Sequence, residues 1–323
     1  MTAAVAPKMW ALVSWKAALL LFALLNWKSL PFAWTYRVFY YIFRNLRRDP
    51  VKLLKLGPQP VDARGRPTHP IFAAASITSY TSLLETDYNM HKSNSTYYAD
   101  MDISRTSVVT QLYTPGADIV SRELDAELAA AAKAEGKPVP KKRLPMYIAL
   151  GANFCSFKRE LKPLRRFEMR SQVAAWDEKW LYVVTYFLQS AQKGAEPTLA
   201  AIGVSKYCFK KGRLTVPIER VVRASGLLPP RPDGVSTPVP PVSSTPTTNG
   251  LSSALDESKL ELIEIGKKAE PRVLEQQRQK NIDSWDPNVW TWERIEEQRK
   301  RGLEMLQGFL TLDSKLLQDW NQA

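Results

Sequence analysis

Residues 85–97 read ETDYNMHKSNSTY, and this stretch decides the fold because it separates two different sequence periodicities. The run before it, residues 71–82 (IFAAASITSYTS), has the apolar and β-branched composition that predicts a strand. The run after it repeats apolar residues at helical intervals over residues 93–113, which predicts a helix. A strand, a polar turn and a long helix therefore open the predicted domain.

Further predicted elements follow this helix. Residues 121–135 are rich in Ala and Glu and predict a second helix. Strand-like runs with short breaks then predict an antiparallel meander over residues 145–158, 166–176, 179–190 and 198–209. One strand, a long helix and a meander indicate an α+β domain, in which a curved antiparallel sheet wraps around a helix.

The turn at residues 85–97 gathers side chains that suit hydrolysis. A loop before a helix presents free backbone N–H groups, which can hold a developing oxyanion. Asp87 lies near these groups and suits a nucleophile or a base that activates water. His91 and Asn94 are three residues apart and share one face of a helical turn. A purely structural interpretation also fits, in which Ser93 or Asn94 caps the helix, Asp87 stabilises a turn and His91 is a hydrogen-bonded residue at the helix start.

The spacing D-x-x-x-H-x-x-N-x-x-Y at residues 87–97 resembles the hotdog-fold thioesterases of the 4-hydroxybenzoyl-CoA thioesterase type, whose common form is D-x-x-G-H-V/M-N-N. The likeness extends to the thioesterase superfamily member six group and its fungal relatives, some of which belong to lipopeptide and polyketide biosynthetic clusters. Residues 176–182 (WDEKWLY) resemble the hairpin turn of that group, as does the hydrophobic N-terminus. The resemblance covers about residues 70–220.

This resemblance implies a single hotdog domain that hydrolyses an acyl thioester. The substrate would be an acyl-CoA or a carrier-bound acyl or polyketide chain, in lipid metabolism or fungal secondary metabolism. Asp87 matches the catalytic aspartate of the family, and His91 and Asn94 match its His and second Asn. The resemblance also implies a homodimer.

The sequence departs from the family pattern at three positions, where Met90 replaces Gly, Lys92 replaces Val or Met, and Ser93 replaces the first Asn. A change from Gly to Met alters the backbone that enters the helix. The alternative function is therefore a non-catalytic, membrane-associated acyl-binding or scaffold protein of the same fold. A hotdog dehydratase is a weaker third option, because its Pro-rich His motif is absent.

The positive charge of the chain is local. The net charge is +13, and residues 141–170 carry nine basic residues against two acids. Arg and Lys pair readily with phosphates, so part of this cluster is predicted to bind the phosphates of coenzyme A. The residues concerned are Lys158, Arg159, Lys162, Arg165 and Arg166. A solvated charged turn is an equally good interpretation, and no signature of a nucleic-acid-binding module occurs.

The few cysteines and histidines limit other chemistry. The chain has two Cys and two His, without the paired spacing of a zinc site. It also has no P-loop, no dinucleotide-binding glycine motif and no HExxH motif. We therefore expect neither a cofactor nor a metal ion.

The N-terminal region has the composition of a membrane anchor. Residues 9–27 (MWALVSWKAALLLFALLNW) carry a single charge, Lys16, and at about 1.5 Å per residue just span a hydrocarbon core. Residues 30–43 are rich in Trp, Tyr and Phe and predict an interfacial helix. Basic residues are concentrated after this region, so we expect membrane contact through residues 9–43 and a cytosolic catalytic domain at the endoplasmic reticulum or a similar membrane. The alternative is a buried core helix.

The predicted organisation has five parts. An anchor and basic segment (1–56) and a linker (57–70) precede the hotdog domain (71–222). A Pro/Ser/Thr-rich disordered segment with a short helix (223–284) and a C-terminal amphipathic helix (285–323) follow it. The last helix is expected to pack on the domain, with a partner or the membrane as alternatives.

Overall fold

The computed structural model of the protein describes residues 15–45, 60–138, 146–189, 196–232 and 270–322. The start of the predicted anchor, residues 9–14, lies outside these residues. Most of the predicted disordered segment, residues 233–269, lies outside them as well.

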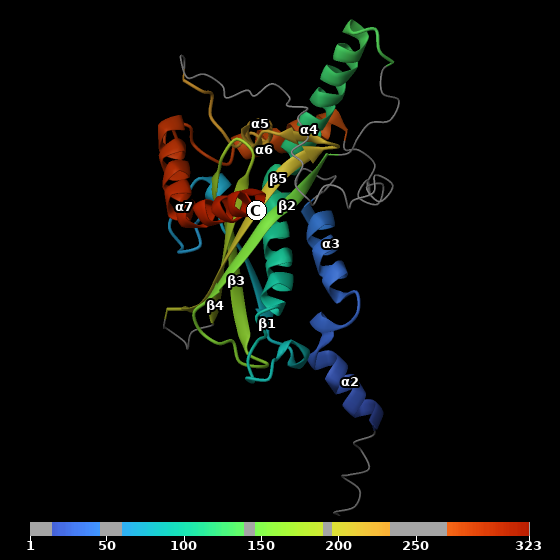
Figure 1. Ribbon diagram of the computed structural model, residues 1–323, viewed down its shortest axis with the longest axis vertical. Coiled ribbons are helices and arrows are strands. Elements are labelled where there is room, and N and C mark those ends of the chain that lie inside the picture. The colour runs from blue at the N-terminus through green and yellow to red at the C-terminus, as the bar shows by residue number, and fades with distance from the viewer. Residues whose placement is uncertain (1–14, 46–59, 139–145, 190–195, 233–269, 323) are drawn as a thin grey trace, which may run out of the picture.

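The core is a six-stranded antiparallel sheet in the order β1-β3-β4-β5-β2, with β6 paired to β5 (Figure 1). Its strands are β1 (Ala75–Tyr80), β2 (Met146–Phe157), β3 (Arg166–Trp176), β4 (Leu181–Gln189), β5 (Thr198–Lys211) and β6 (Leu214–Val216). The predicted meander is confirmed for β3, β4 and β5, but it is wrong for β2, which pairs with β5. β5 is 14 residues long and bonds to β2 along one side. Along the other side it bonds to β4 up to Tyr207 and to β6 from Phe209 to Lys211. Regular spacing in the sequence cannot reveal such a crossover, because it records strand order and not strand neighbours.

One helix covers each face of the sheet. Helix α4 (Thr96–Ala134) packs on the inner face, and helix α7 (Trp292–Gln322) packs on the outer face (Figure 1). A glycine permits each close approach: a Cβ at Gly203 would lie 2.3 Å from the sulfur of Met101, and one at Gly302 would lie 2.0 Å from the carbonyl oxygen of Ala174. The expected hotdog arrangement, a curved antiparallel sheet around a long helix, is confirmed, and so is the packing of the C-terminal helix on the domain.

Helix α4 is a single helix of 39 residues, so the prediction of two helices over residues 93–113 and 121–135 is wrong. The sequence suggests a break because Pro115 has no N–H and disrupts a helix interior. The next residue, Gly116, packs against helix α5 (Ile218–Ala224) and donates its N–H to the Ser225 hydroxyl at 3.2 Å. Tertiary packing therefore holds the helix together through the proline.

The N-terminal region forms helix α2 (Trp15–Leu25), a short 3₁₀ helix η1 (Trp27–Ser29) and helix α3 (Ala33–Asn45). Helix α3 packs along α4, where the Asn45 amide donates to the Ser107 carbonyl at 3.1 Å and to the Thr110 hydroxyl at 2.7 Å. Of the predicted anchor over residues 9–27, residues 9–14 lie outside the described residues, and the described part is helical from Trp15 to Leu25. Among the described residues, no helix combines the length and the apolar character needed to cross a bilayer.

The stretch predicted as a linker, residues 57–70, is described from residue 60 onward and folds back onto the domain. The Ala63 N–H donates to the Gln172 side chain of β3 at 2.6 Å. His69 is fully buried, with its ring 4.9 Å from that of Trp285 and 5.7 Å from that of Trp290. These two tryptophans lie between helix α6 (Pro271–Ile282) and α7, so residues 60–72 connect the sheet to the C-terminal helices.

Candidate active site

The predicted site lies in a tight turn between β1 and α4. Thr86 and Lys92 pair as an isolated antiparallel bridge, and the Asp87 N–H donates to the His91 carbonyl at 3.0 Å. The Met90 N–H donates back to the Asp87 carbonyl at 3.0 Å, and the Asp87 carboxylate accepts from the Asn89 N–H at 2.9 Å. Asp87 therefore stabilises its own turn, as the structural interpretation expects, and one of its carboxylate oxygens is used in doing so.

Met90 occupies the position where the family pattern has Gly, and it retains a glycine-like backbone. Its φ angle is +61°, in the left-handed region, and its side chain is 70% exposed. Left-handed backbone costs a residue with a Cβ about 1–2 kcal/mol, which the hydrogen bonds of the turn offset. Met90 therefore adopts a backbone conformation that glycine also adopts readily, and its exposed side chain is what distinguishes it from the Gly of the family pattern.

His91 lies between two carboxylates. Its Nδ1 is 3.6 Å from the Asp87 carboxylate, and its Nε2 is 3.9 Å from that of Glu160. The side chains of Asp87 and His91 are each 20% exposed, so both groups are accessible from solvent. Asn94 is exposed in the turn that leads into α4, and no hydrogen bond or ion pair among the described residues joins it to Asp87 or His91. The structure thus brings together two of the three predicted catalytic residues.

Helix α4 begins at Thr96, so the amides of its first turn lack acceptors within the helix. Tyr97, the last residue of the predicted motif, is buried against the rings of Phe157 and Phe187. Burial raises the pKa of Tyr97 strongly, and the nearby charges, including that of Asp87, add to this effect. Tyr97 is therefore a neutral phenol in the first turn of the helix.

The predicted basic cluster neighbours this turn in space, although about 70 residues separate the two in the sequence. The loop between β2 and β3 holds Lys158, Arg159, Lys162 and Arg165, Arg166 is the first residue of β3, and all five are exposed. The Lys92 N–H donates to the Leu161 carbonyl of that loop at 2.8 Å, and the Thr81 N–H donates to the Arg165 carbonyl at 3.1 Å. None of the five side chains forms an ion pair with another described residue. Exposed, uncompensated cations therefore border the Asp87 turn.

Sequence reasoning missed two members of this site. Glu160 lies within the basic loop and approaches His91, and Leu161 is the buried residue that attaches the loop to Lys92. Leu161 could have been predicted to be buried, because it is an apolar residue within a highly charged stretch. Nothing in the sequence indicates that Glu160 faces His91, because the contact depends on the pairing of β1 with β3.

A third chemically reactive group, the thiol of Cys155, is present near Tyr97 but is unsuited to nucleophilic attack. Cys155 is buried and free, and burial raises its pKa to about 11. Its thiol therefore stays protonated at neutral pH. The carboxylate of Asp87 is the stronger candidate for the reacting group.

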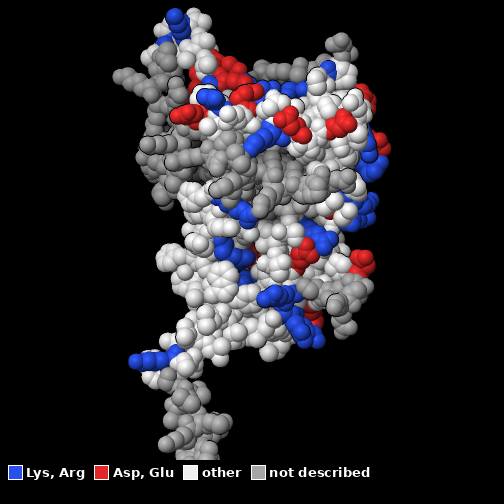
Figure 2. Space-filling view, turned by 180° about the vertical axis from the view of Figure 1, so that it is seen from behind, with Lys and Arg blue, Asp and Glu red and all other residues white. Residues whose placement is uncertain are grey.

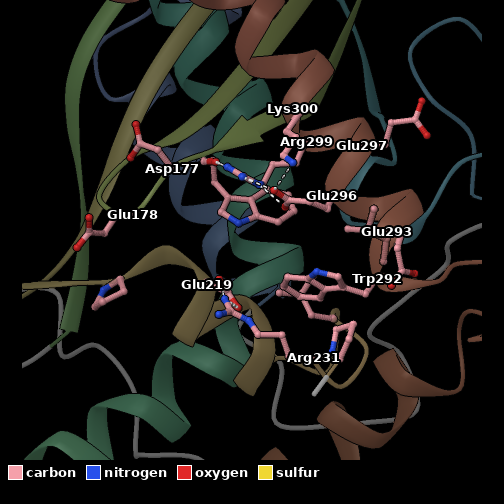
Figure 3. Close-up of a pocket in the computed structure, with 15 residues that line it drawn as sticks. Asp177, Glu178, Glu219, Arg231, Trp292, Glu293, Glu296, Glu297, Arg299 and Lys300 are labelled. Atoms are coloured by element: carbon pink, nitrogen blue, oxygen red, sulfur yellow. Dashed lines mark hydrogen bonds and ion pairs between the residues drawn. The ribbon is translucent and has the colours of Figure 1, made fainter. Parts of the chain in front are cut away.

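A cavity of about 730 Å³ lies elsewhere, at the opposite end of β3, between the β3–β4 turn, α5 and α7 (Figure 3). Its principal charged groups are already paired: Arg231 with Glu219 at 2.6 Å, and Arg299 with Glu296 at 2.6 Å. β3 spans about 30 Å at roughly 3.3 Å per residue, and the Asp87 turn lies near its other end. No residue of the Asp87 turn lines this cavity.

Comparisons with known proteins agree with this geometry. The profile of the Thioesterase-like superfamily matches residues 82–226. Thioesterase lcsJ of Purpureocillium lilacinum is 32% identical over 329 residues, which cover 95% of this chain and 94% of that protein. The probable thioesterase atnL of Emericella nidulans is 37% identical over 225 residues, covering 64% of this chain and 70% of that protein. The probable thioesterase YBR096W of Saccharomyces cerevisiae is 28% identical over 206 residues, covering 64% and 77% of the two chains.

The first of these relatives aligns along nearly the whole chain, and the matched superfamily range contains both the Asp87 turn and the sheet that supports it. The resemblance found in the motif at residues 87–97 is therefore confirmed. The chain belongs to the thioesterase-like superfamily of hotdog proteins and is a thioester hydrolase.

Proposed function

We propose that this enzyme hydrolyses an acyl thioester at the Asp87 turn. The observation that carries the proposal is the convergence of Asp87 and His91, 3.6 Å apart, in front of the first turn of α4. In this scheme the Asp87 carboxylate either takes a proton from the attacking water or attacks the thioester carbonyl itself. In the first route the oxygen of the water adds to the carbonyl carbon, the carbon–sulfur bond breaks, and the thiolate takes up the proton that Asp87 accepted, which leaves a carboxylic acid and a thiol. In the second route the carbon–sulfur bond breaks to give a mixed anhydride on Asp87 and a thiolate, and water then hydrolyses the anhydride to the carboxylic acid and the Asp87 carboxylate, with release of a proton that the thiolate takes up.

The start of α4 supports the proposed transition state. Amides of the first helical turn have no helical acceptors and carry the positive end of the helix dipole. They can donate to the oxyanion that forms when the carbonyl carbon becomes tetrahedral. His91, held between Asp87 and Glu160, would orient the Asp87 carboxylate, and Asn94 would contact the substrate from the exposed side of the turn.

The basic loop supports coenzyme A as the thiol carrier. Coenzyme A ends in a diphosphate and a 3′-phosphate, and Arg and Lys side chains form strong charge-assisted hydrogen bonds with such groups. The five exposed cations of residues 158–166 would bind these phosphates while the thioester reaches Asp87. A phosphopantetheine chain on a carrier protein has one phosphate and suits the same loop. We propose fungal secondary metabolism as the setting, since the resemblance in the motif includes enzymes of such clusters.

Strand β2 supports a homodimer. It lies at the edge of the sheet, is 12 residues long and exposes the side chains of Leu150, Phe154 and Phe157. A long apolar edge strand is normally covered by another chain. Pairing of two β2 strands would continue the sheet and enclose the substrate between the two copies. Sedimentation velocity of the wild type and of a Phe154→Glu variant tests this, and a wild-type monomer at micromolar concentration would contradict it.

The N-terminal helices support attachment to a membrane surface. The exposed large apolar side chains of this region are Trp15, Leu19, Leu20, Leu21, Phe22, Leu24, Trp27, Leu30, Phe32, Trp34, Tyr36, Tyr40 and Phe43. In Figure 2 the lower part of the molecule is mostly uncharged, whereas acidic side chains gather at the upper end. Helices rich in Trp, Tyr and Leu insert at the depth of lipid headgroups.

We propose that α2 and α3 lie on the cytosolic face of the endoplasmic reticulum or a similar membrane. Liposome flotation tests this binding. A Leu20→Glu/Phe32→Glu double variant should lose it, whereas Tyr88→Glu, at an exposed position outside these helices, should keep it. Retention of binding by the double variant would contradict the proposal.

The proposed reaction is tested with a panel of acyl-CoA esters and acyl-pantetheine esters of different chain length, with thiol release as the readout. We expect hydrolysis of at least one ester, and Asp87→Asn should reduce kcat by about 10²–10³-fold because the amide cannot accept the proton. The matched control is Tyr88→Ala, in the same turn, whose side chain is 93% exposed. Tight binding without turnover across the panel would instead favour an acyl-binding protein.

A further inference from the structure

Four charged side chains form a buried cluster directly behind the Asp87 turn. They are Lys28, Glu85, Lys92 and Asp100, and their side chains are 0–8% exposed. The Lys28 ammonium lies 3.0 Å from Glu85 and 2.9 Å from Asp100. The Lys92 ammonium lies 3.2 Å from Glu85 and 2.8 Å from Asp100. Each lysine therefore contacts both carboxylates, and Arg37 adds a partner for Asp100 at 3.4 Å.

The cluster joins both ends of the Asp87 turn to the rest of the molecule. Glu85 precedes the turn and Lys92 closes it, and the Ser93 N–H donates to the Glu85 carbonyl at 2.7 Å. Asp100 belongs to the first turns of α4, so the same charges fix the turn relative to the start of that helix. A displacement of either end would move Asp87 and His91 away from the amides of α4.

Lys28 is the member of the cluster that comes from the N-terminal region. Besides its two carboxylate contacts, its ammonium donates to the Ser79 hydroxyl at 3.0 Å and to the Tyr80 carbonyl at 2.8 Å. Asn26, two residues before Lys28, contacts the same part of the chain, since the Leu84 N–H donates to its side-chain oxygen at 2.8 Å. The superfamily profile matches the chain from residue 82, so Lys28 lies outside the range that this profile matches.

The stability of this buried cluster depends on each of its four charges. Two ammonium groups and two carboxylates balance one another in a place from which water is almost excluded. Burial lowers the pKa of Lys28, whereas in Asp100 the charges of Lys92 and Lys28 outweigh burial and lower the pKa of the carboxyl. Removal of one member leaves an uncompensated buried charge, which the surrounding turn must rearrange to expose.

We infer that Lys28 is a positioning residue of the active site and that the segment Asn26–Ser29 is a structural part of it. This inference rests on the proposed function, since it concerns the geometry of the Asp87 turn. It predicts that the domain matched by the superfamily profile is not sufficient for full activity, although it contains Asp87 and His91.

The test compares three variants of the full chain. Lys28→Met removes the charge and keeps the length of the side chain, Lys28→Arg keeps the charge, and Lys16→Met on exposed α2 is the control. We expect Lys28→Met to lower kcat by about 10–100-fold with little change in KM, because small displacements of a reacting group have effects of this size. Lys28→Arg should retain most of the wild-type kcat, because it keeps the positive charge. Lys16→Met should have the kcat and KM of the wild type.

A double variant separates positioning from general stability. Lys28→Met/Glu85→Gln removes one cation and one anion, so it restores the charge balance and should recover thermal stability relative to Lys28→Met. If Lys28 positions the turn, kcat stays low in the double variant. Recovery of kcat together with stability would overturn the inference.

Hydrogen–deuterium exchange provides a readout that does not need catalysis. The amides of Asp87 and Lys92 are bonded to the carbonyls of His91 and Leu161, and we expect Lys28→Met to increase exchange in residues 86–93 but not in β4. Unchanged exchange there would overturn the inference even if no substrate were hydrolysed. An Asp87→Asn enzyme as active as wild type would instead overturn the proposed function.

Discussion

The charged cluster behind the Asp87 turn and the Arg–Glu pairs near the cavity at the other end of the sheet differ in burial. Near Asp87, the lysines and carboxylates of the cluster around Lys28 are at most 8% exposed. Near the cavity at the other end, the side chains in the Arg220–Glu123, Arg231–Glu219 and Arg299–Glu296 pairs are 12–49% exposed. Exposed ion pairs contribute little because water screens them, whereas a broken buried pair is costly. The buried cluster thus fixes the turn that carries Asp87 and His91 more firmly than the exposed pairs fix the residues around the cavity.

The largest expected effect compares one lysine of the buried cluster with one arginine of the exposed pairs. Lys92→Met should lower the free energy of unfolding by about 3–5 kcal/mol, because Glu85 and Asp100 lose a buried partner. Arg220→Met, which loses the partially exposed contacts with Glu123 and Glu127, should cost less than about 1 kcal/mol. Urea denaturation of both variants measures the two values. Similar losses of unfolding free energy in the two variants would contradict the proposed difference between the buried cluster and the exposed pairs.

The next effect concerns His69, which is buried near the end of the sheet that carries the cavity. Burial lowers its pKa to about 3, so the folded protein holds the neutral ring. The unfolded chain binds the proton near pH 6.5, and stability is therefore present above that pH and is lost as the pH falls toward 3. We expect a loss of about 1.4 kcal/mol for each pH unit below 6.5.

The measurement for His69 is the difference in unfolding free energy between wild type and His69→Gln at pH 7 and pH 5. The difference removes the contribution of the carboxyl groups, which titrate in both proteins. His91→Gln is the matched control, since the His91 side chain is 20% exposed. A pH dependence that is the same in wild type and His69→Gln would show that His69 is not held neutral.

A smaller effect compares basic residues at the two ends of the sheet. Lys162→Ala/Arg165→Ala should raise KM for an acyl-CoA about 30-fold, because each of the two lost phosphate contacts costs roughly 1 kcal/mol. KM for the matching acyl-N-acetylcysteamine ester, which has no phosphate, should not change. Arg220→Ala at the other end should alter neither value. An equal rise in KM for both esters would indicate that the basic loop affects the Asp87 turn and does not bind the phosphates of coenzyme A.

The smallest effect concerns the backbone of the Asp87 turn. Met90→Gly should raise the free energy of unfolding by at most about 1 kcal/mol, since glycine adopts the left-handed region without strain but is freer in the unfolded chain. Met90→Val should lower it by about 1–3 kcal/mol, because a β-branched residue is poorly tolerated there. Thermal unfolding of both variants, with Met90→Ala as the reference, gives the two differences. A stabilising Met90→Val would contradict the observed turn.

Much of the fold was predictable because it depends on local periodicity. The bounds of β3 match the predicted strand over residues 166–176, and the other predicted strands differ from the structure by a few residues at their ends. The Asp87 turn was predictable for a related reason, since its residues lie within one short motif. The continuity of α4 through Pro115 was not, because it depends on contacts with α5 that lie about 110 residues further along the chain.

Periodicity alone indicated the α+β order of strand, helix and strands, and the short motif placed Asp87 and His91 in one turn and carried the resemblance to hotdog thioesterases, because both are local properties of the chain. Only the tertiary structure decided that β2 pairs with β5, that Glu160 and the basic loop border His91, and that Lys28 reaches Asp100. These contacts join residues from about 50 to more than 70 positions apart. Buried charges in particular have no local sequence signature. In the sequence, a lysine that will be buried looks the same as a surface lysine, because its partners lie far away along the chain.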